Sequence, residues 1–245
     1  MKADPTVQKR LLDLAGVDAE LNRLGHRRRS LPEHAELTAA EAAVRAAKDA
    51  VVEAETNAGD LDRDIRRIER DVDAVRARTE RDEKLLSGAG IGAKQAGDIQ
   101  HELETLARRR TVLEDEQLEV MEQREAVGSH LDHARVTLEA AERELAAVVE
   151  RRDAALADID AGEAGRRRDR ETVLADLPAD LVALYEKRRE QTGTGAALLV
   201  SRRCQACRLE LDRTAIAELR AAAADAVVRC EECGAILVRT PESGL

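Results

Sequence analysis

Aromatic residues are almost absent from this 245-residue chain, which contains no Phe, no Trp and a single Tyr, Tyr185. Large globular cores draw much of their buried area from aromatic side chains, so a large core is not expected here. Charged residues make up 37% of the chain and apolar residues 43%, and the apolar ones are largely Ala, Leu and Val. This composition is typical of long helices packed along narrow seams, and the helical periodicity described below disfavours disorder.

Long apolar runs are also absent. No window approaches the roughly 20 apolar residues of a membrane span, and Met1–Pro5 is not followed by the apolar segment of an export signal. We therefore expect a cytoplasmic protein with no membrane partner. In that reducing compartment, paired Cys-x-x-Cys motifs favour metal or redox chemistry over structural disulfides. The net charge of −10 argues against bulk attraction to nucleic acid, although a local basic patch would still act.

Apolar residues recur in two long stretches with alternating steps of four and three, from Ala40 to Leu86 and again from Ile99 to Val148. A mean period of 3.5 residues predicts a left-handed coiled coil. Between the two stretches, residues 87–93 contain three glycines within five positions, which end a helix cheaply and let the chain reverse. The sequence therefore predicts an antiparallel hairpin, with Ala47 roughly opposite Ala134.

Two further boundaries divide the chain. We expect a kink near residues 30–32, with Ser30 as the N-cap of the next helix and Pro32 unable to continue a preceding one. Leu177-Pro178 marks the second boundary and is followed by a short amphipathic helix. The predicted organisation is a coiled-coil helical hairpin over residues 1–177 and a short helix plus a small zinc ribbon over residues 178–245. The expected fold class is mainly α, with a long antiparallel coiled-coil hairpin and a small C-terminal β ribbon.

All four cysteines of the chain lie in two Cys-x-x-Cys motifs, Cys204 with Cys207 and Cys230 with Cys233. Each spacing lets a tight knuckle direct both sulfurs to one point, and two knuckles complete a tetrahedral thiolate site for one Zn²⁺. Four thiolates leave the metal no open coordination position, so a structural rather than catalytic zinc is predicted. A dithiol redox pair is the main rival, but neither motif sits in a strand–helix context of the thioredoxin kind.

With these motifs the chain resembles a bacterial C4-type zinc-ribbon family that carries an N-terminal coiled-coil hairpin and is described as of unknown function. The matching residues, beside the four cysteines, are Lys84-Leu85-Leu86-Ser87-Gly88, Lys94-Gln95, Ile99, Glu102-Leu103, Leu106, Leu113-Glu114-Asp115, Leu118 to Glu122, Leu209, Leu211, Glu218-Leu219, Val228, Gly234 and Ile236-Leu237. The family often has Gly-Cys-His where this chain has Ala206-Cys207-Arg208, and Cys-Pro where it has Cys230-Glu231. Some members resemble flagellar regulators that bind a sigma factor or messenger RNA, which implies a transcription-related partner.

Two sets of residues are candidates for contacts with a partner. Arg202, Arg203 and Arg208 flank the first cysteine pair and form one possible phosphate-contact surface, whereas charge runs on such proteins usually serve solubility and ion pairing. Leu118 and Met121 fall off the seam, and exposed Leu and Met together often mark a protein contact. Local packing or self-association is the alternative for that pair.

These observations favour a non-enzymatic adaptor, in which a coiled coil presents a zinc ribbon to a protein partner, with transcription as one setting. The alternative is an RNA- or DNA-binding protein that uses the ribbon and the arginine clusters. These clusters are Arg27–Arg29, Arg108–Arg110, Arg166–Arg168 and Arg202-Arg203. The weakness of this alternative is that the ribbon has no aromatic side chain for base stacking. No His-Glu-x-x-His motif or nucleophile elbow occurs, so neither an enzyme nor a small-molecule substrate is expected.

Overall fold

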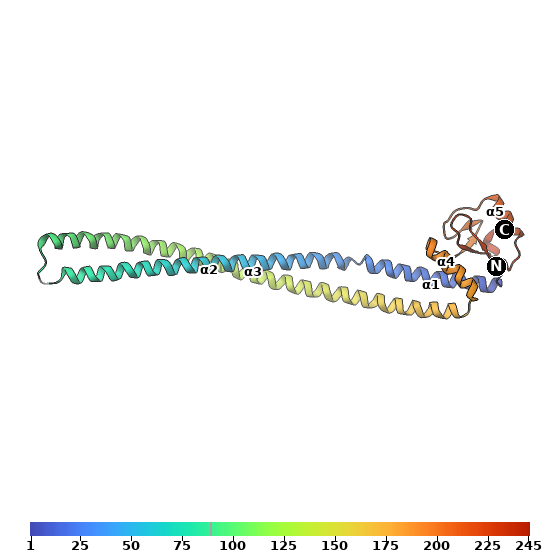
Figure 1. Ribbon diagram of the computed structural model, residues 1–245, viewed down its shortest axis with the longest axis horizontal. Coiled ribbons are helices and arrows are strands. Elements are labelled where there is room, and N and C mark those ends of the chain that lie inside the picture. The colour runs from blue at the N-terminus through green and yellow to red at the C-terminus, as the bar shows by residue number, and fades with distance from the viewer. Residues whose placement is uncertain (89) are drawn as a thin grey trace. The chain divides into compact units, whose positions relative to one another are not determined.

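The computed structural model describes residues 1–88 and 90–245 of the chain (Figure 1). Helices predominate, and the strands gather near the C-terminal end. The elements are, in chain order, α1 (Pro5–Arg29), α2 (Pro32–Leu86), α3 (Ala93–Ala175), α4 (Ala179–Thr192), β1 (Ala196–Val200), β2 (Arg203–Cys204), α5 (Arg213–Ala221), β3 (Val228–Arg229), β4 (Ile236–Val238) and the 3₁₀ helix η1 (Pro241–Ser243). This confirms the predicted fold class.

The chain forms two compact units. Unit 1 contains Met1–His34 and Arg151–Leu245, and unit 2 contains Ala35–Glu150. The border between the units therefore falls within α2 and α3 rather than at a loop. The predicted domain border between residues 177 and 178 stays a prediction.

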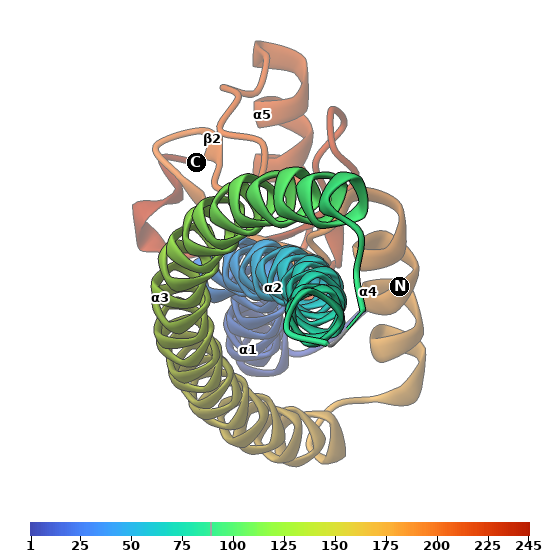
Figure 2. The same cartoon turned by 90° about the vertical axis from the view of Figure 1, so that its left-hand side faces the viewer.

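Unit 2 is an antiparallel pair made by α2 and α3, which wind past each other in Figure 2. The residues of the 3.5-period seam are buried or half-buried, and Ile68, Val72 and Leu113 form its best-packed cluster. Ion pairs between the arms fix the direction: an early α2 residue pairs with a late α3 residue, and a late one with an early one. These pairs are Lys48 with Glu142, Glu55 with Arg135, Asp62 with Arg124, Arg76 with Glu114 and Arg78 with Glu102.

The reversal between α2 and α3 lies over residues 87–92. Gly90 has a backbone φ of 100°, a conformation that favours glycine. The predicted turn at 87–93 also includes Ala89, which is outside the described residues. Within the part that the structure describes, α2 ends at Leu86 and α3 begins at Ala93.

The break between α1 and α2 spans residues 30–31, but Ser30 does not act as predicted. Its backbone N–H donates to the carbonyl of His26 at 3.0 Å and its hydroxyl donates to the same oxygen at 2.9 Å. Ser30 therefore caps the end of α1 and is not the N-cap of α2. Pro32 begins α2, because the missing proline N–H needs no partner in the first turn of a helix.

The helices of unit 1 are locked by a buried ionic cluster around Asp18 of α1. The Asp18 carboxylate, only 3% exposed, accepts the Tyr185 hydroxyl at 2.7 Å and the Nε of Arg170 at 2.8 Å, and the Nε of Arg189 lies at 3.2 Å. Three helices, α1, α3 and α4, thus meet on one carboxylate. Burial and the hydrogen bond to Asp18 raise the pKa of Tyr185 well above its usual value.

A four-stranded sheet in the order β2-β1-β4-β3 forms the base of the ribbon. β1 pairs in parallel with β4, while β1 with β2 and β3 with β4 are antiparallel. One face packs on α1 and α4 through a cluster that includes Leu11, Leu181, Tyr185 and Ile236. The other face packs on α5 and the cysteine knuckles through a cluster that includes Leu199 and Leu237.

Gly195, just before β1, allows the sheet to approach α4. A Cβ at this position would lie 2.4 Å from the ring of Tyr185, a distance at which the ring would have to move. Because Tyr185 is fully buried, that movement would disturb the whole core between α4 and the sheet.

Candidate metal centre

The first knuckle follows the tight β1–β2 hairpin and is followed by α5. Cys204 ends β2, and its backbone N–H donates to the carbonyl of Leu209 at 3.1 Å. The backbone N–H of Arg208 donates to the carbonyl of Cys204 at 2.7 Å, which closes the knuckle. Asp212 then caps α5, because its carboxylate accepts the Ala215 N–H at 2.7 Å.

The second knuckle connects β3 to β4 with the same bonds. The N–H of Gly234 donates to the carbonyl of Cys230 at 2.9 Å, and the N–H of Cys230 donates to the carbonyl of Ala235 at 2.9 Å. Gly234 has a φ of 75°, which explains why a residue without a Cβ follows the second cysteine. β3 enters this knuckle and β4 leaves it.

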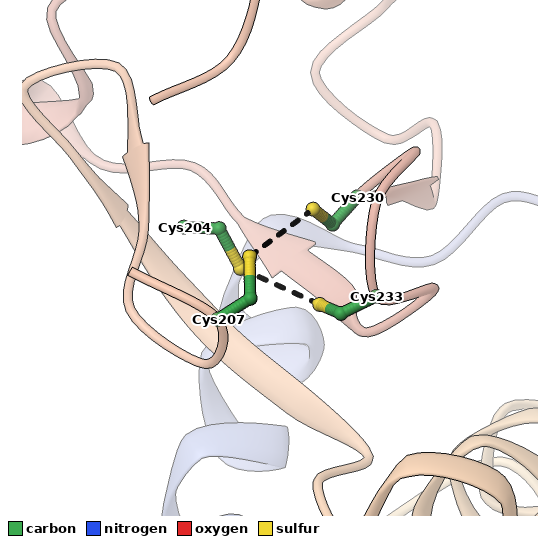
Figure 3. A group of neighbouring side chains, drawn as sticks. All are labelled: Cys204, Cys207, Cys230 and Cys233. Carbon is green, nitrogen blue, oxygen red and sulfur yellow. Dashed lines mark hydrogen bonds between the residues drawn. The ribbon is translucent and has the colours of Figure 1, made fainter. Parts of the chain in front are cut away.

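The two knuckles bring all four sulfurs together, as Figure 3 shows. Their Sγ atoms all lie within 4.8 Å of one another, with Cys204 and Cys233 3.8 Å apart and Cys207 and Cys230 3.9 Å apart. A tetrahedron with Zn–S bonds of about 2.3 Å has sulfurs separated by about 3.8 Å. The four thiols are therefore placed to bind one metal ion, and the donor set fits zinc.

The thiols differ in their readiness to lose a proton. Burial raises the pKa of Cys204 to about 12 and also raises the pKa of Cys230. The pKa of Cys207 is lowered: its slight burial acts in the opposite direction, but the backbone N–H of Leu209 and the neighbouring thiols outweigh it. Zinc binding therefore has to displace protons that the buried fold retains, so metal uptake is coupled to proton release.

This arrangement suits a structural role. The zinc ribbon takes a single Zn²⁺, and four thiolates would hold that ion without leaving a position for water or substrate. Bound there, the ion links β2, β3 and the loops around them, a region whose own apolar core is small. Within the described part of the chain, no other group of three or more His, Cys, Asp or Glu side chains is placed to hold a metal.

The arginines predicted beside the first knuckle are exposed but are not equivalent. Arg203 pairs with Glu210 at 3.3 Å, and the Nε of Arg202 donates to the carbonyl of Gly244 at 3.3 Å. Arg202 and Arg208 both have left-handed backbones, with φ of 65° and 62°. Leu209, which follows Arg208 in the chain, is 51% exposed.

Leu118 and Met121 belong to unit 2, and their side chains are 59% and 48% exposed. Both line a shallow surface groove together with Ile65 and Glu122. Both side chains thus lie off the seam, in agreement with their positions in the heptad pattern. Their predicted contact with a partner stays a prediction.

A second surface feature of unit 1 was not predicted from the sequence. A groove of about 600 Å³ lies beside the second knuckle, lined by residues of α5, by β3 and by Arg188 of α4. The sequence signal for Arg188 is its helical spacing from Tyr185. This spacing predicts which face of α4 carries Arg188, but it does not predict that a sheet edge lies beside that face. Separately, none of the described helices is long and apolar enough to cross a bilayer.

Two family models match the chain. Residues 14–193 match the CT398-like coiled coil hairpin domain, and residues 203–237 match the C4-type zinc ribbon domain. An uncharacterized protein of Mycobacterium tuberculosis is 43% identical over 239 residues, which cover 98% of both chains. An uncharacterized protein of Mycobacterium leprae is 31% identical over 223 residues, covering 91% of this chain and 96% of its own.

Solved structures agree with the fold. A Mycobacterium smegmatis protein is 42% identical and superimposes with a TM-score of 0.88, covering 98% of this chain and all of its own. CT398 from Chlamydia trachomatis superimposes with a TM-score of 0.70 at 18% identity, covering 95% of this chain and 97% of its own, and supports the fold alone.

Proposed function

This chain belongs to the CT398-like coiled-coil hairpin family with a C4-type zinc ribbon, and we propose that it is a non-enzymatic adaptor whose ribbon binds another protein. The observation that carries the proposal is the closed four-thiol site. It stabilises a small fold and leaves the metal no position for chemistry. We therefore infer that the ribbon acts through its surface, and we assign a protein as its partner.

Two surfaces support the proposal. In unit 1, Leu209 and the preceding Arg208 are both exposed at the first knuckle. In unit 2, the exposed Leu118 and Met121 lie over a groove. Exposed apolar side chains surrounded by charged ones are common at protein contacts. We place the protein in the cytoplasm, where thiols stay reduced, and take the transcription machinery as the first source of partners to test.

The test is a crosslinking pull-down with the zinc-loaded full chain from its own cells, in parallel with Cys204→Ser. The adaptor proposal expects partners that the wild type captures and Cys204→Ser loses. A Leu118→Ser/Met121→Ser double variant reports separately on the coiled coil and leaves the metal site intact. Equal recovery with and without the ribbon's zinc would contradict a role for the ribbon in recognition.

Nucleic acid is the second candidate. The observation that favours it is that Arg202 and Arg208 form no ion pair with any described residue, in contrast to Arg203, which pairs with Glu210. Phosphate contacts by such side chains predict affinity that falls steeply with salt. Binding of RNA and DNA measured between about 50 and 200 mM salt separates this candidate from the first. No binding below micromolar at moderate salt would discard it.

A further inference from the structure

The β3 edge of the sheet in unit 1 is partly paired with another segment of the same chain. β3 is the outermost strand, and its residues alternate between bonds to β4 and bonds directed outward. Cys230 bonds inward to Ala235, so the backbone N–H and C=O of Arg229 are directed outward. Two positions earlier on the same edge, the Val227 N–H donates to the carbonyl of Met1 at 3.1 Å.

The added segment at that edge is Met1–Ala3. Lys2 forms an antiparallel bridge with Ala226, and the Ala3 N–H donates to the carbonyl of Asp225 at 2.7 Å. The edge is thus occupied beside residues 225–227, while the next outward-directed backbone groups, those of Arg229, have no strand partner among the described residues.

The groove of about 600 Å³ lies along this same stretch. Its lining combines residues from both faces of the sheet: Leu219 and Ala222 come from α5 on one face, and Arg188 comes from α4 on the other. A groove with walls from both faces has to lie at the β3 edge. Its apolar floor includes Val228, so the groove offers both backbone pairing and side-chain contacts to an extended chain.

Arg188 is one of two arginines that line the groove, beside Arg229. Its Nε is buried and has no hydrogen-bond partner among the described residues, while its Nη1 donates to the side chain of Gln191 at 3.1 Å. The guanidinium lies against the second knuckle, 3.5 Å from where a Cβ on Gly234 would be. A buried donor without a partner is costly, and a carboxylate is the acceptor that fits a guanidinium best.

We propose that this groove binds an extended segment of a partner protein, which adds to the sheet beside Arg229 and places one carboxylate on Arg188. The proposal rests on the adaptor function and names the site and the kind of segment that it recognises. Glu218 and Glu231 also line the groove and repel additional acidic residues. The preferred segment therefore carries a single Asp or Glu among β-branched residues.

The test selects random seven-residue peptides, displayed on phage, on the zinc-loaded full chain. The expected enriched peptides have one acidic residue between β-branched ones, and the amide of Arg229 gains protection from hydrogen exchange when a synthetic copy binds. Arg188→Gln should weaken that peptide about tenfold, the loss expected for one charged hydrogen bond. Replacing the peptide's acidic residue by its amide should cost the same on the wild type and nothing more on Arg188→Gln.

Two variants serve as controls. Arg213→Gln removes a positive charge from the exposed start of α5, outside the groove, and should leave peptide binding unchanged. Glu218→Gln removes a repulsive carboxylate and should strengthen binding about two- to threefold. Zinc content and the thermal unfolding of each variant show that it is folded. No enrichment, equal binding to Arg188→Gln, or an unprotected Arg229 amide would each overturn the groove.

The pull-down separates the groove from the adaptor function. Zinc-dependent capture of partners that is unchanged by Arg188→Gln would remove the groove and leave the adaptor intact. Peptide binding with all the expected variant effects, but without any zinc-dependent partner in cells, would retain the groove and remove the adaptor.

Discussion

The two knuckles of the ribbon have the same backbone and a different residue at its tightest position. In both, the residue after the second cysteine has a left-handed backbone and donates its N–H to the carbonyl of the first cysteine. That residue is Arg208 in the first knuckle and Gly234 in the second. A left-handed conformation costs an L-residue about 1–2 kcal/mol and costs glycine almost nothing.

The surroundings explain why only one knuckle has glycine. The residue after Gly234 is Ala235, which is fully buried, and Gly234 itself lies against Arg188. The residue after Arg208 is Leu209, which is 51% exposed. The first knuckle thus faces solvent and tolerates a long side chain at a cost in backbone energy. In the second knuckle the glycine contacts Arg188 and the residue after it is buried.

The largest effect is expected when the metal site, which the two knuckles share, is removed. Cys204→Ser and Cys230→Ser should each abolish stable zinc binding and unfold the ribbon, because structural zinc contributes roughly 10–16 kcal/mol to such folds. Zinc content and amide exchange of the ribbon measure this, and a strong chelator on the wild type should reproduce it. The helical signal of unit 2 serves as the control. If one variant kept its zinc, the knuckles would not contribute equally to the site.

Gly234→Ala should cost about 1–2 kcal/mol of ribbon stability, because alanine meets the full penalty of the left-handed backbone. Chemical unfolding of the zinc-loaded protein, followed at the ribbon, measures the change. Ala206→Gly in the first knuckle is a useful control for a small change near the metal. An unchanged midpoint for Gly234→Ala would mean that the second knuckle relaxes as easily as the first.

Arg208→Gly reverses the comparison and should stabilise the ribbon by up to about 1 kcal/mol, since relief of backbone strain exceeds the entropy that glycine adds to the unfolded chain. The same unfolding measurement applies. A destabilised Arg208→Gly would show that the arginine side chain contributes contacts that outweigh its backbone cost.

The smallest effect is expected at Leu209. Leu209→Ala should change stability by no more than about 0.5 kcal/mol, because the side chain is largely in solvent already. Its position in the knuckle matches that of buried Ala235, where Ala235→Leu should destabilise by about 1–3 kcal/mol through overpacking. The pair tests directly whether the first knuckle is open and the second is packed.

Local sequence patterns were sufficient for most of this fold. The four-and-three spacing identified the hairpin seam, and the two Cys-x-x-Cys motifs identified the metal centre, because both depend on residues close in the chain. The short helix after Leu177-Pro178 was predicted in the same way, and α4 lies there.

Long-range contacts could not be predicted from these local sequence patterns. Nothing near β1 signals that it pairs in parallel with β4, and the polar Asp18 gives no sign that it will be buried among Tyr185 and two arginines. Ser30 was misassigned because serine is favoured at an N-cap, whereas here its hydroxyl donates back to the His26 carbonyl in the last turn of α1. The groove was missed for the same reason, since its walls come from three separate elements.

Tyr185 is the single aromatic residue of the chain, so the near-ultraviolet absorbance of the protein reports on this one side chain. Ionisation of the phenol is suppressed while the residue stays buried on Asp18, so its absorbance should remain that of the neutral ring at alkaline pH until α1, α4 and the sheet separate. The raised pKa adds stability below about pH 10, the value for a free tyrosine, and this stability is lost as the pH rises towards the folded-state pKa. An absorbance titration then monitors the helical face of the sheet, while thiol–metal absorption monitors the opposite face in the same sample.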